Sequence, residues 1–395
     1  MLIIPIHILY IMKNCFPILL LLLSSVTIGR AQSKQTDNPM QYRVLKGYLR
    51  NHPKGKIAIP DILGYRTLKA DLHLHTHQSD GNVSPMFRVL EAYEEGLDAI
   101  AITDHQPGSR FNGTTDGNIS YNQAVKTAKK HNITLIRGAE VTSEARGPHY
   151  KEVGHLNFLF TQDNNRYYPR TPDRDVSPAV ADSLLRQAKA DSVWVTTNHP
   201  GWPDHDSELS QFLIGHIQAG NIQGVEVFND QEFYPRAIDY LYDYDLAPIS
   251  ATDCHYPIAY RFDLGRAHRD MTLIFARDNS IPAIREAMLA RRTVAYADNI
   301  LVGKQEYVEA LLRASVSMDT PTPDADGRIV VSFTNVSDIP YILHDAKTGT
   351  TLTIKPLGTT ETTCDKRSLK RQWEVLNIYL HPTVHLSVSL SSLVR

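Results

Sequence analysis

The feature that most constrains the fold is a repeated order of a short apolar run followed by a helical pattern. Apolar runs typical of buried strands lie at 67–75, 98–103, 133–138, 192–197, 223–228 and 247–252. Apolar residues at helical spacing predict helices near 84–96, 121–131, 178–190, 208–219 and 235–243. This alternation predicts parallel strands, and this many units predicts an α/β fold of the β/α barrel type.

One of these helices shows both of its ends in the sequence. Ser84-Pro85 is a typical start, because a serine side chain caps the first turn and proline suits the first helical position. Gly96 is a typical end, since glycine readily takes the left-handed conformation that closes a helix. We therefore expect a helix between Ser84 and Gly96.

The character of the sequence changes after about residue 315. Runs at 328–334, 351–356 and 372–380 alternate or are apolar, with turn residues between them. They predict a small C-terminal β-sandwich without catalytic residue types. The predicted organisation is a signal peptide at 1–31, an N-terminal extension at 32–65, a barrel at 66–312 and a β-sandwich-like domain at 313–395.

The N-terminus carries the pattern of an export signal. Lys13 precedes the apolar run Ile18–Leu23, and Gly29-Arg30-Ala31 offers small residues for cleavage before Gln32. The apolar run is too short to span a membrane well. We expect an exported protein, periplasmic or extracellular, with no membrane span in the mature chain.

Charge and cysteine content limit the partners of the mature chain. Cleavage after residue 31 removes Lys13 and Arg30 and no acid, which lowers the formal net charge from −2 by two units. A weakly acidic chain lacks the cationic field that long nucleic acids favour, so we see no strong nucleic-acid signature. Cys254 and Cys364 remain after cleavage. Because Cys254 lies between two candidate ligands, we expect it to be free and buried.

Residues that can bind metal ions follow most of the predicted strands. His73 and His75 alternate along a strand, so their side chains point to the same side and can converge on one metal. Further candidates are His105 of Thr103-Asp104-His105, Glu140, His155, His199, and Asp253 and His255 of Asp253-Cys254-His255. Barrel enzymes carry their chemistry at the carboxyl ends of the strands. Several ligand types at one such end predict a multinuclear metal site.

The ordered series of motifs resembles the PHP superfamily, named for polymerase and histidinol phosphatase. The motifs are His73-Leu74-His75, Ser79-Asp80-Gly81 with Ser84-Pro85, Thr103-Asp104-His105, Glu140, His155, Asn198-His199-Pro200 and Asp253-Cys254-His255. The resemblance covers about residues 66–300. It implies a distorted (β/α)7 barrel that holds two to three divalent metal ions and hydrolyses phosphoesters.

The resemblance also implies how the ligands are shared. One metal would be held by His73, His75, Glu140 and Asp253. Glu140 would bridge to a second metal, which is held also by His155 and His199. A third metal would be held by Asp80, His105 and His255. Imidazole and carboxylate ligands suit Zn, Mn or Fe, and their spacing does not choose among these metals. The implied nucleophile is a metal-bound hydroxide, so no nucleophilic side chain is required.

Two features bear on the substrate. Asp80 stands where histidinol phosphatases usually have a histidine, which is similar to the nuclease- and phosphodiesterase-like branch. A signal peptide, a barrel and a small β domain together resemble secreted Sb-PDE-type phosphodiesterases acting on small phosphoesters. Arg266, and with less support Arg110 and Arg261, would clamp phosphate oxygens. The inserted segment 163–175, rich in Arg, Tyr and Pro, has no assigned role.

Three alternative readings remain open. A histidinol-phosphatase-like phosphomonoesterase is less favoured because of the export signal and Asp80. An amidohydrolase also begins with two histidines on a barrel strand, but that class typically needs a metal-bridging lysine where this chain has Glu140. A non-catalytic secreted binding module is disfavoured because every ligand position is filled. The sequence leaves the natural substrate and the oligomeric state undetermined.

Overall fold

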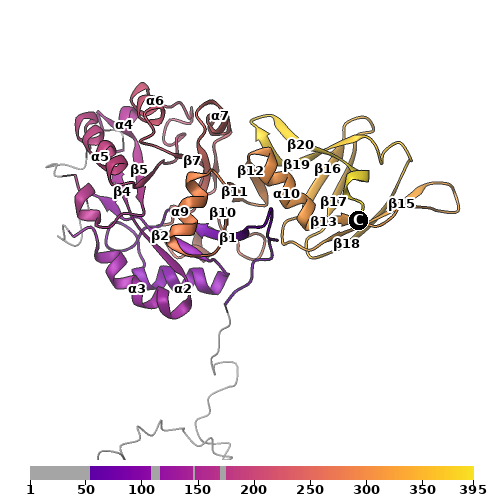
Figure 1. Cartoon of the computed structure of the whole chain (residues 1–395), viewed down its shortest axis with the longest axis horizontal. Helices are drawn as coiled ribbons and strands as arrows, with labels where there is room; N and C mark the ends of the chain where they lie inside the picture. Colours follow the sequence, from indigo (N-terminus) through magenta and orange to yellow (C-terminus); the bar gives the residue numbers. More distant parts are fainter. Residues whose placement is uncertain (1–53, 108–115, 146, 170–174) are drawn as a thin grey trace, which may run out of the picture. The chain divides into compact units, whose positions relative to one another are not determined.

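The computed structural model describes residues 54–107, 116–145, 147–169 and 175–395 (Figure 1). The predicted signal peptide 1–31, Arg110 and part of the 163–175 segment lie outside the described residues. The described end of the N-terminal extension belongs to the core, where Ile57 and Ile59 are buried. Among the described residues, no helix combines the length and apolar character needed to cross a membrane.

In the described part of the chain, seven strands form a closed ring. They are β1 (Arg66–Asp71), β2 (Ala99–Ile102), β4 (Thr134–Thr142), β5 (His155–Leu159), β6 (Trp194–Thr197), β7 (Gly224–Asn229) and β9 (Ala247–Ala251), each paired with the next. The ring closes where the segments after β1 and β9 meet, through a parallel bridge between Leu74 and Cys254. The backbone N–H of Asp253 donates to the carbonyl of His73 at 2.9 Å. The predicted distorted seven-stranded barrel is thus confirmed.

The sequence did not predict strand β5, and the expectation that the barrel strands are parallel is wrong for it. This strand runs antiparallel to both β4 and β6. The connection from β4 contains only the four-residue helix α4 (Tyr150–Val153), and Ser143 N–H donates to Gly154 O at 3.2 Å. Because Thr142 at the end of β4 pairs with His155 at the start of β5, the chain returns in the opposite direction. The first residue of β5, His155, therefore lies at the same end of the barrel as the last residues of its neighbours.

Helices between the strands follow the predicted pattern closely. They are α2 (Pro85–Glu95), α3 (Ile119–His131), α5 (Pro178–Ala190), α6 (Gln211–Gln218), α7 (Arg236–Asp243), α8 (Ile258–Arg261) and α9 (Ile281–Leu289). In α2, Ser84 Oγ accepts from Phe87 N–H at 3.2 Å, and Gly96 closes the helix at φ 96°. The sequence thus located both ends of this helix.

The C-terminal third adds antiparallel strands that the sequence predicted only in part. β10 (Met271–Ala276) pairs with β1, and β11 (Thr293–Ala297) and β12 (Ile300–Gly303) extend the sheet. They are followed by α10 (Gln305–Ser315), β13 (Val316–Met318), β14 (Thr322–Pro323), β15 (Ile329–Asn335), β16 (Tyr341–Asp345), β17 (Thr350–Ile354), β18 (Gly358–Cys364), β19 (Gln372–His381) and β20 (Val384–Ser389). Short strands β3 (His105–Gln106) and β8 (Glu232–Phe233) border the barrel's ligand-bearing end.

The C-terminal strands form two layers around one apolar core. Strands β13, β14, β15 and β18 make an antiparallel sheet, while β16, β17, β19 and β20 join the large sheet through the pairing of β12 with β19. Phe333 and Trp373 belong to the same core cluster. The predicted small C-terminal β domain is confirmed as a fold. Its predicted boundary at residues 312 and 313 falls inside α10 and stays a prediction.

Two fully buried arginines hold the segments at which the barrel closes. Arg269 Nη1 donates to Asp71 Oδ2 at 3.1 Å, and Thr252 Oγ1 donates to the same oxygen at 2.8 Å. Arg88 Nε donates to the carbonyl of His75 at 2.9 Å. Buried guanidinium groups are tolerated only when paired and hydrogen-bonded, so these contacts fix the chain on either side of the ligand residues.

Candidate metal centre

Glu140 lies at the centre of the ligand-bearing end of the barrel. Its side chain is fully buried near the end of β4, a position that an unpaired carboxylate would not occupy. Glu140 Oε1 lies 3.1 Å from His155 Nδ1 and 3.3 Å from His73 Nε2, and Oε2 lies 2.6 Å from His105 Nδ1. One carboxylate thus contacts imidazoles that come from three separate segments of the chain.

The nine predicted ligands gather into three neighbouring sets, two of which share His75. Within each set the ligand atoms lie within 4.8 Å of one another, and the sets are His73, His75 and Asp253; Glu140, His155 and His199; and His75, Asp80, His105 and His255. Glu140 also approaches the first set, since its Oε2 lies 3.5 Å from His75 Nε2. The structure therefore brings together all nine residues in nearly the grouping that the resemblance implied. Their role as ligands stays a prediction.

The electrostatic balance of the cluster keeps its acids charged. Although burial by itself raises the pKa of Glu140, His105 and the other nearby imidazoles hold it well below its usual range. The pKa of Asp253 is likewise lowered, because His73 and His75 outweigh its burial. Burial, followed by the charges of His255 and His105, lowers the pKa of His75 to about 4. Charged carboxylates beside a neutral imidazole are the donors that divalent cations bind.

Two oxygens provide a direct test of whether the residues fit metal ions. Glu140 Oε2 and Asp253 Oδ1 are buried, and the nearest imidazole nitrogens, 2.6 Å and 2.9 Å away on His105 and His75, do not meet them in hydrogen-bonding geometry. A buried carboxylate oxygen without a donor is costly, and a cation at that point removes the cost. Nitrogen and carboxylate oxygen donors of this kind suit Zn, Mn or Fe. The side chains present therefore fit several divalent ions.

The sequence missed Glu226, which orients two of the candidate ligands. This buried residue of β7 places Oε1 2.8 Å from His73 Nδ1, and its Oε2 accepts from His199 N–H at 2.8 Å. The contact favours the His73 tautomer that carries its proton on Nδ1 and leaves Nε2 for a metal. A charged residue within the apolar run 223–228 was the signal that could have revealed it.

Of the arginines expected to clamp phosphate, the two that the structure describes, Arg261 and Arg266, do not line the metal-site cavity. This cavity of about 390 Å³ contains Asp80, His105, His155, His199, Asp253 and His255 in its walls. Arg266 lines a different cavity, and its guanidinium lies 3.2 Å from Asp298. Arg261 pairs with Asp230, a residue of the metal-site cavity, at 2.6 Å.

Cys254 is free and buried, as predicted.

Comparison with known proteins identifies the family. The PHP domain family matches residues 71–245. A solved two-domain protein from Bacteroides vulgatus, described as containing a predicted PHP-like metal-dependent phosphoesterase, is 30% identical, with 86% of this chain and 99% of that chain covered and a TM-score of 0.75. The chain belongs to the PHP family.

A second relative is similar over part of its length. A 5'-3' exoribonuclease of Haemophilus influenzae is 36% identical to this PHP protein over 177 residues, which is 43% of this chain. The match spans 56% of that relative's own length. The likeness therefore covers only part of either chain.

Replacement of Glu140 tests its bridging position. Glu140→Gln keeps the shape of the side chain but removes its charge, which offsets the repulsion between neighbouring dications. We expect loss of more than one equivalent of metal, measured by elemental analysis, and a fall in turnover of about two or more orders of magnitude. Glu361→Gln, on exposed β18, is the matched control. Full metal content with turnover within about threefold, roughly 0.65 kcal/mol of barrier, would show that Glu140 does not bridge.

Replacement of Glu226 tests its orienting role. Glu226→Gln preserves volume but weakens the contact that fixes the His73 ring. Partners of this kind typically change metal affinity by about 10- to 100-fold, so we expect that loss in a competition titration with a chromogenic chelator. An affinity within about twofold of wild type would contradict the role.

Proposed function

We propose that this PHP protein hydrolyses small phosphodiesters. The proposal rests on the convergence of three ligand sets around one cavity. His75 belongs to two of these sets, and Glu140 contacts residues of all three. Phosphoester hydrolysis needs positive charge at the phosphoryl oxygens and an activated water, and a cluster of this composition is suited to supply both through bound cations.

The chain's own residues prepare this chemistry by holding their donor atoms in place. Glu226 fixes His73, and the carbonyl of Ser143 lies 3.0 Å from His155 Nε2, which directs His155 Nδ1 toward Glu140. Asp104 accepts from Thr76 N–H at 2.7 Å and so shapes the loop that carries Asp80. Because the donors are fixed before the substrate binds, little reorganisation is needed during the reaction.

The charges around the cavity favour a diester over a monoester. The described wall residues include the acids Glu144, Asp230 and Glu232 in addition to the candidate ligands, and no lysine or arginine is among them. A phosphomonoester is close to a dianion at neutral pH, whereas a diester carries one negative charge. Fewer cations in the wall therefore suit the diester. Asp80, which stands where histidinol phosphatases usually have a histidine, also favours a diester.

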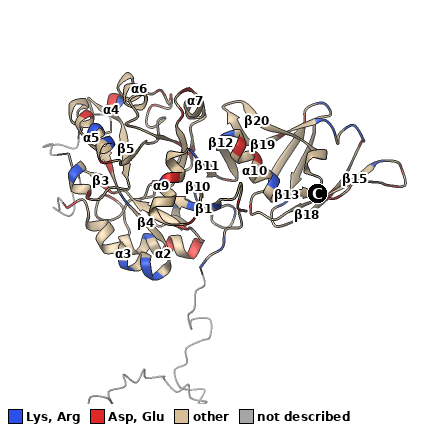
Figure 2. Cartoon of the chain, viewed as in Figure 1, with Lys and Arg blue, Asp and Glu red and all other residues tan. Residues whose placement is uncertain are grey.

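Long nucleic acids are a less suitable substrate than small esters. The exoribonuclease relative acts on RNA by its name, and exoribonucleases break phosphodiester bonds, so the relative supports this bond class. Figure 2 shows that Lys and Arg are interspersed with Asp and Glu along the described helices and strands, so residues of like charge are not gathered in one region. A polyanion gains little from such a surface.

Hydrolysis of two chromogenic esters tests the proposed reaction. We expect chelator-sensitive turnover of bis(p-nitrophenyl) phosphate, restored by Mn or Zn, with a higher kcat/KM than for p-nitrophenyl phosphate. Preference for the monoester would favour the phosphatase alternative. Turnover that persists in protein shown to be free of metal would end the proposal.

We also propose that the protein acts outside the cytoplasm, in the periplasm or beyond the cell. The support is the sequence pattern of residues 1–31, with Lys13 before an apolar run and small residues before Gln32. N-terminal sequencing of the native protein should begin near Gln32. Recovery of residues 1–20 from the purified protein would contradict export.

A further inference from the structure

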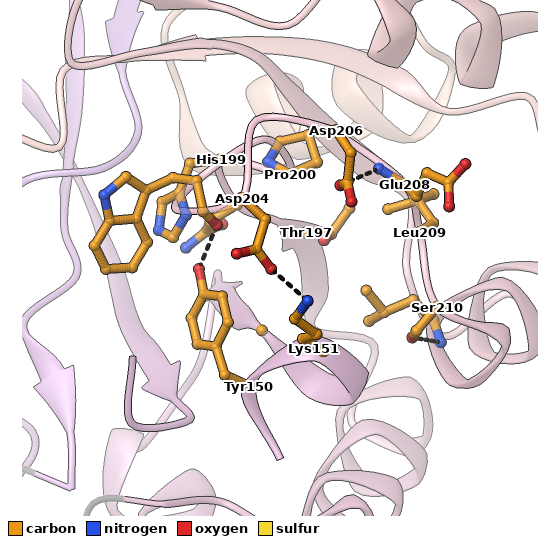
Figure 3. Close-up of a pocket in the computed structure, with 14 residues that line it drawn as sticks. Tyr150, Lys151, Thr197, His199, Pro200, Asp204, Asp206, Glu208, Leu209 and Ser210 are labelled. Carbon is orange, nitrogen blue, oxygen red and sulfur yellow. Dashed lines mark hydrogen bonds and ion pairs between the residues drawn. The ribbon is translucent and has the colours of Figure 1, made fainter. Parts of the chain in front are cut away.

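A second cavity adjoins the metal-site cavity and shares two residues with it. This cavity, drawn in Figure 3, has a volume of about 340 Å³. Both cavities are lined by His199 and Trp202. His199 Nε2 lies 3.7 Å from Glu140 Oε1 and 3.9 Å from Asp253 Oδ2, on the metal side. A substrate whose phosphate lies at the metal centre can therefore extend past Trp202 into the second cavity, which we call the Trp202 cavity.

Aromatic rings form one wall of the Trp202 cavity and are held in place. The indole of Trp202 meets the rings of His199 and Tyr150 edge to face, with centroids 5.4 Å and 5.6 Å apart. Tyr150 Oη donates to the carbonyl of Trp202 at 2.7 Å, a contact drawn in Figure 3. Yet 38% of Trp202 is exposed, although a large apolar side chain gains from burial. A fixed and exposed indole beside a reaction centre is suited to bind part of a ligand.

Carboxylates line the opposite side of the Trp202 cavity. Asp204, Asp206 and Glu208 contribute three acids, and Lys151 is the one basic residue among the described wall residues. Lys151 lies 3.0 Å from Asp204, but its side chain is 82% exposed and can move into solvent (Figure 3). The wall therefore has an excess of negative charge next to an indole.

Two buried side chains of this wall have a polar atom without a partner. Asn198 and His199 are 3% and 4% exposed, and both line the Trp202 cavity. Asn198 Oδ1 and His199 Nδ1 make no hydrogen bond with any described residue, while Asn198 Nδ2 donates to Glu140 Oε1 at 2.9 Å on the metal side. Buried polar atoms are normally paired, so an acceptor and a ring nitrogen left open here indicate a polar ligand. This observation is independent of the acidic side chains.

We propose that the Trp202 cavity binds the alcohol part of the substrate, and that this alcohol carries a positively charged amine, either protonated or quaternary. The inference rests on the proposed function and names its substrate class. Aromatic faces attract ammonium groups, and carboxylates within a few ångströms add a Coulomb term. The phosphate binds at the metal centre while the ammonium group lies between Trp202 and Asp204. The volume suits an alcohol of a few carbon atoms, such as choline or ethanolamine.

A pair of isosteric substrates tests the charge preference. p-Nitrophenyl phosphorylcholine and p-nitrophenyl 3,3-dimethylbutyl phosphate differ only in a trimethylammonium or a tert-butyl group. We expect the wild type to have at least a tenfold higher kcat/KM for the cationic ester. Asp204→Asn and Trp202→Leu should each lower this ratio severalfold, whereas Asp182→Asn, on exposed α5, should leave it unchanged. A wild-type ratio near one, or a ratio unaffected by both site variants, would overturn the proposal.

A binding measurement separates this proposal from the proposed function. Of the three tryptophans, Trp194 and Trp373 are only 1% and 3% exposed, so choline at the cavity should change mainly the fluorescence of Trp202. We expect a saturable change with choline, none with 3,3-dimethylbutanol, and loss of the change in Trp202→Phe. Chelator-sensitive turnover of both esters at equal rates, without choline binding, would reject the subsite and leave the hydrolase intact. Choline binding without turnover of either ester would support the subsite and reject the proposed reaction.

Discussion

The closure of the barrel between the segments after β1 and β9 is the constraint on which the rest of the metal centre depends. The backbone bonds between these segments place His73 and His75 beside Asp253. Neither segment is a regular strand there, so additional contacts must hold it. Arg269 and Arg88 supply them by binding Asp71 and the carbonyl of His75. Two charged groups that are costly to bury are thus used to fix the geometry of the ligands.

The reversed strand β5 is the second constraint. In a barrel of parallel strands, only the residue at the carboxyl end of each strand reaches the reactive end. Because β5 runs the other way, its first residue, His155, arrives at that end from the short α4 connection. The reversal also makes Glu140 the neighbour of a strand that approaches from the opposite side. One carboxylate can therefore contact His73, His105 and His155 together.

The metal centre and the Trp202 cavity are suited to oppositely charged parts of one substrate. Imidazoles and buried acids at the metal centre are arranged for cations and, through them, for phosphate. The adjoining wall of Asp204, Asp206 and Glu208 repels phosphate and favours positive charge. His199 lines both cavities, and its Nε2 lies on the metal side. A zwitterionic ester fits that arrangement better than a polyanion does.

The sequence by itself indicated six of the seven barrel strands and the small C-terminal β domain, whereas β5 was missed, and the resemblance to the PHP superfamily completed the set of nine ligand-type residues. It could do so because strand and helix periods are local, and because residues at the ends of neighbouring strands must meet. Only the tertiary structure decided the direction of β5, which depends on the length and path of a connection rather than on its periodicity. It alone revealed Glu226 as the partner of His73, since their contact joins residues 153 positions apart. It also placed Arg266 away from the cluster, because nearness in sequence to a ligand does not fix where a long side chain finds its counter-charge.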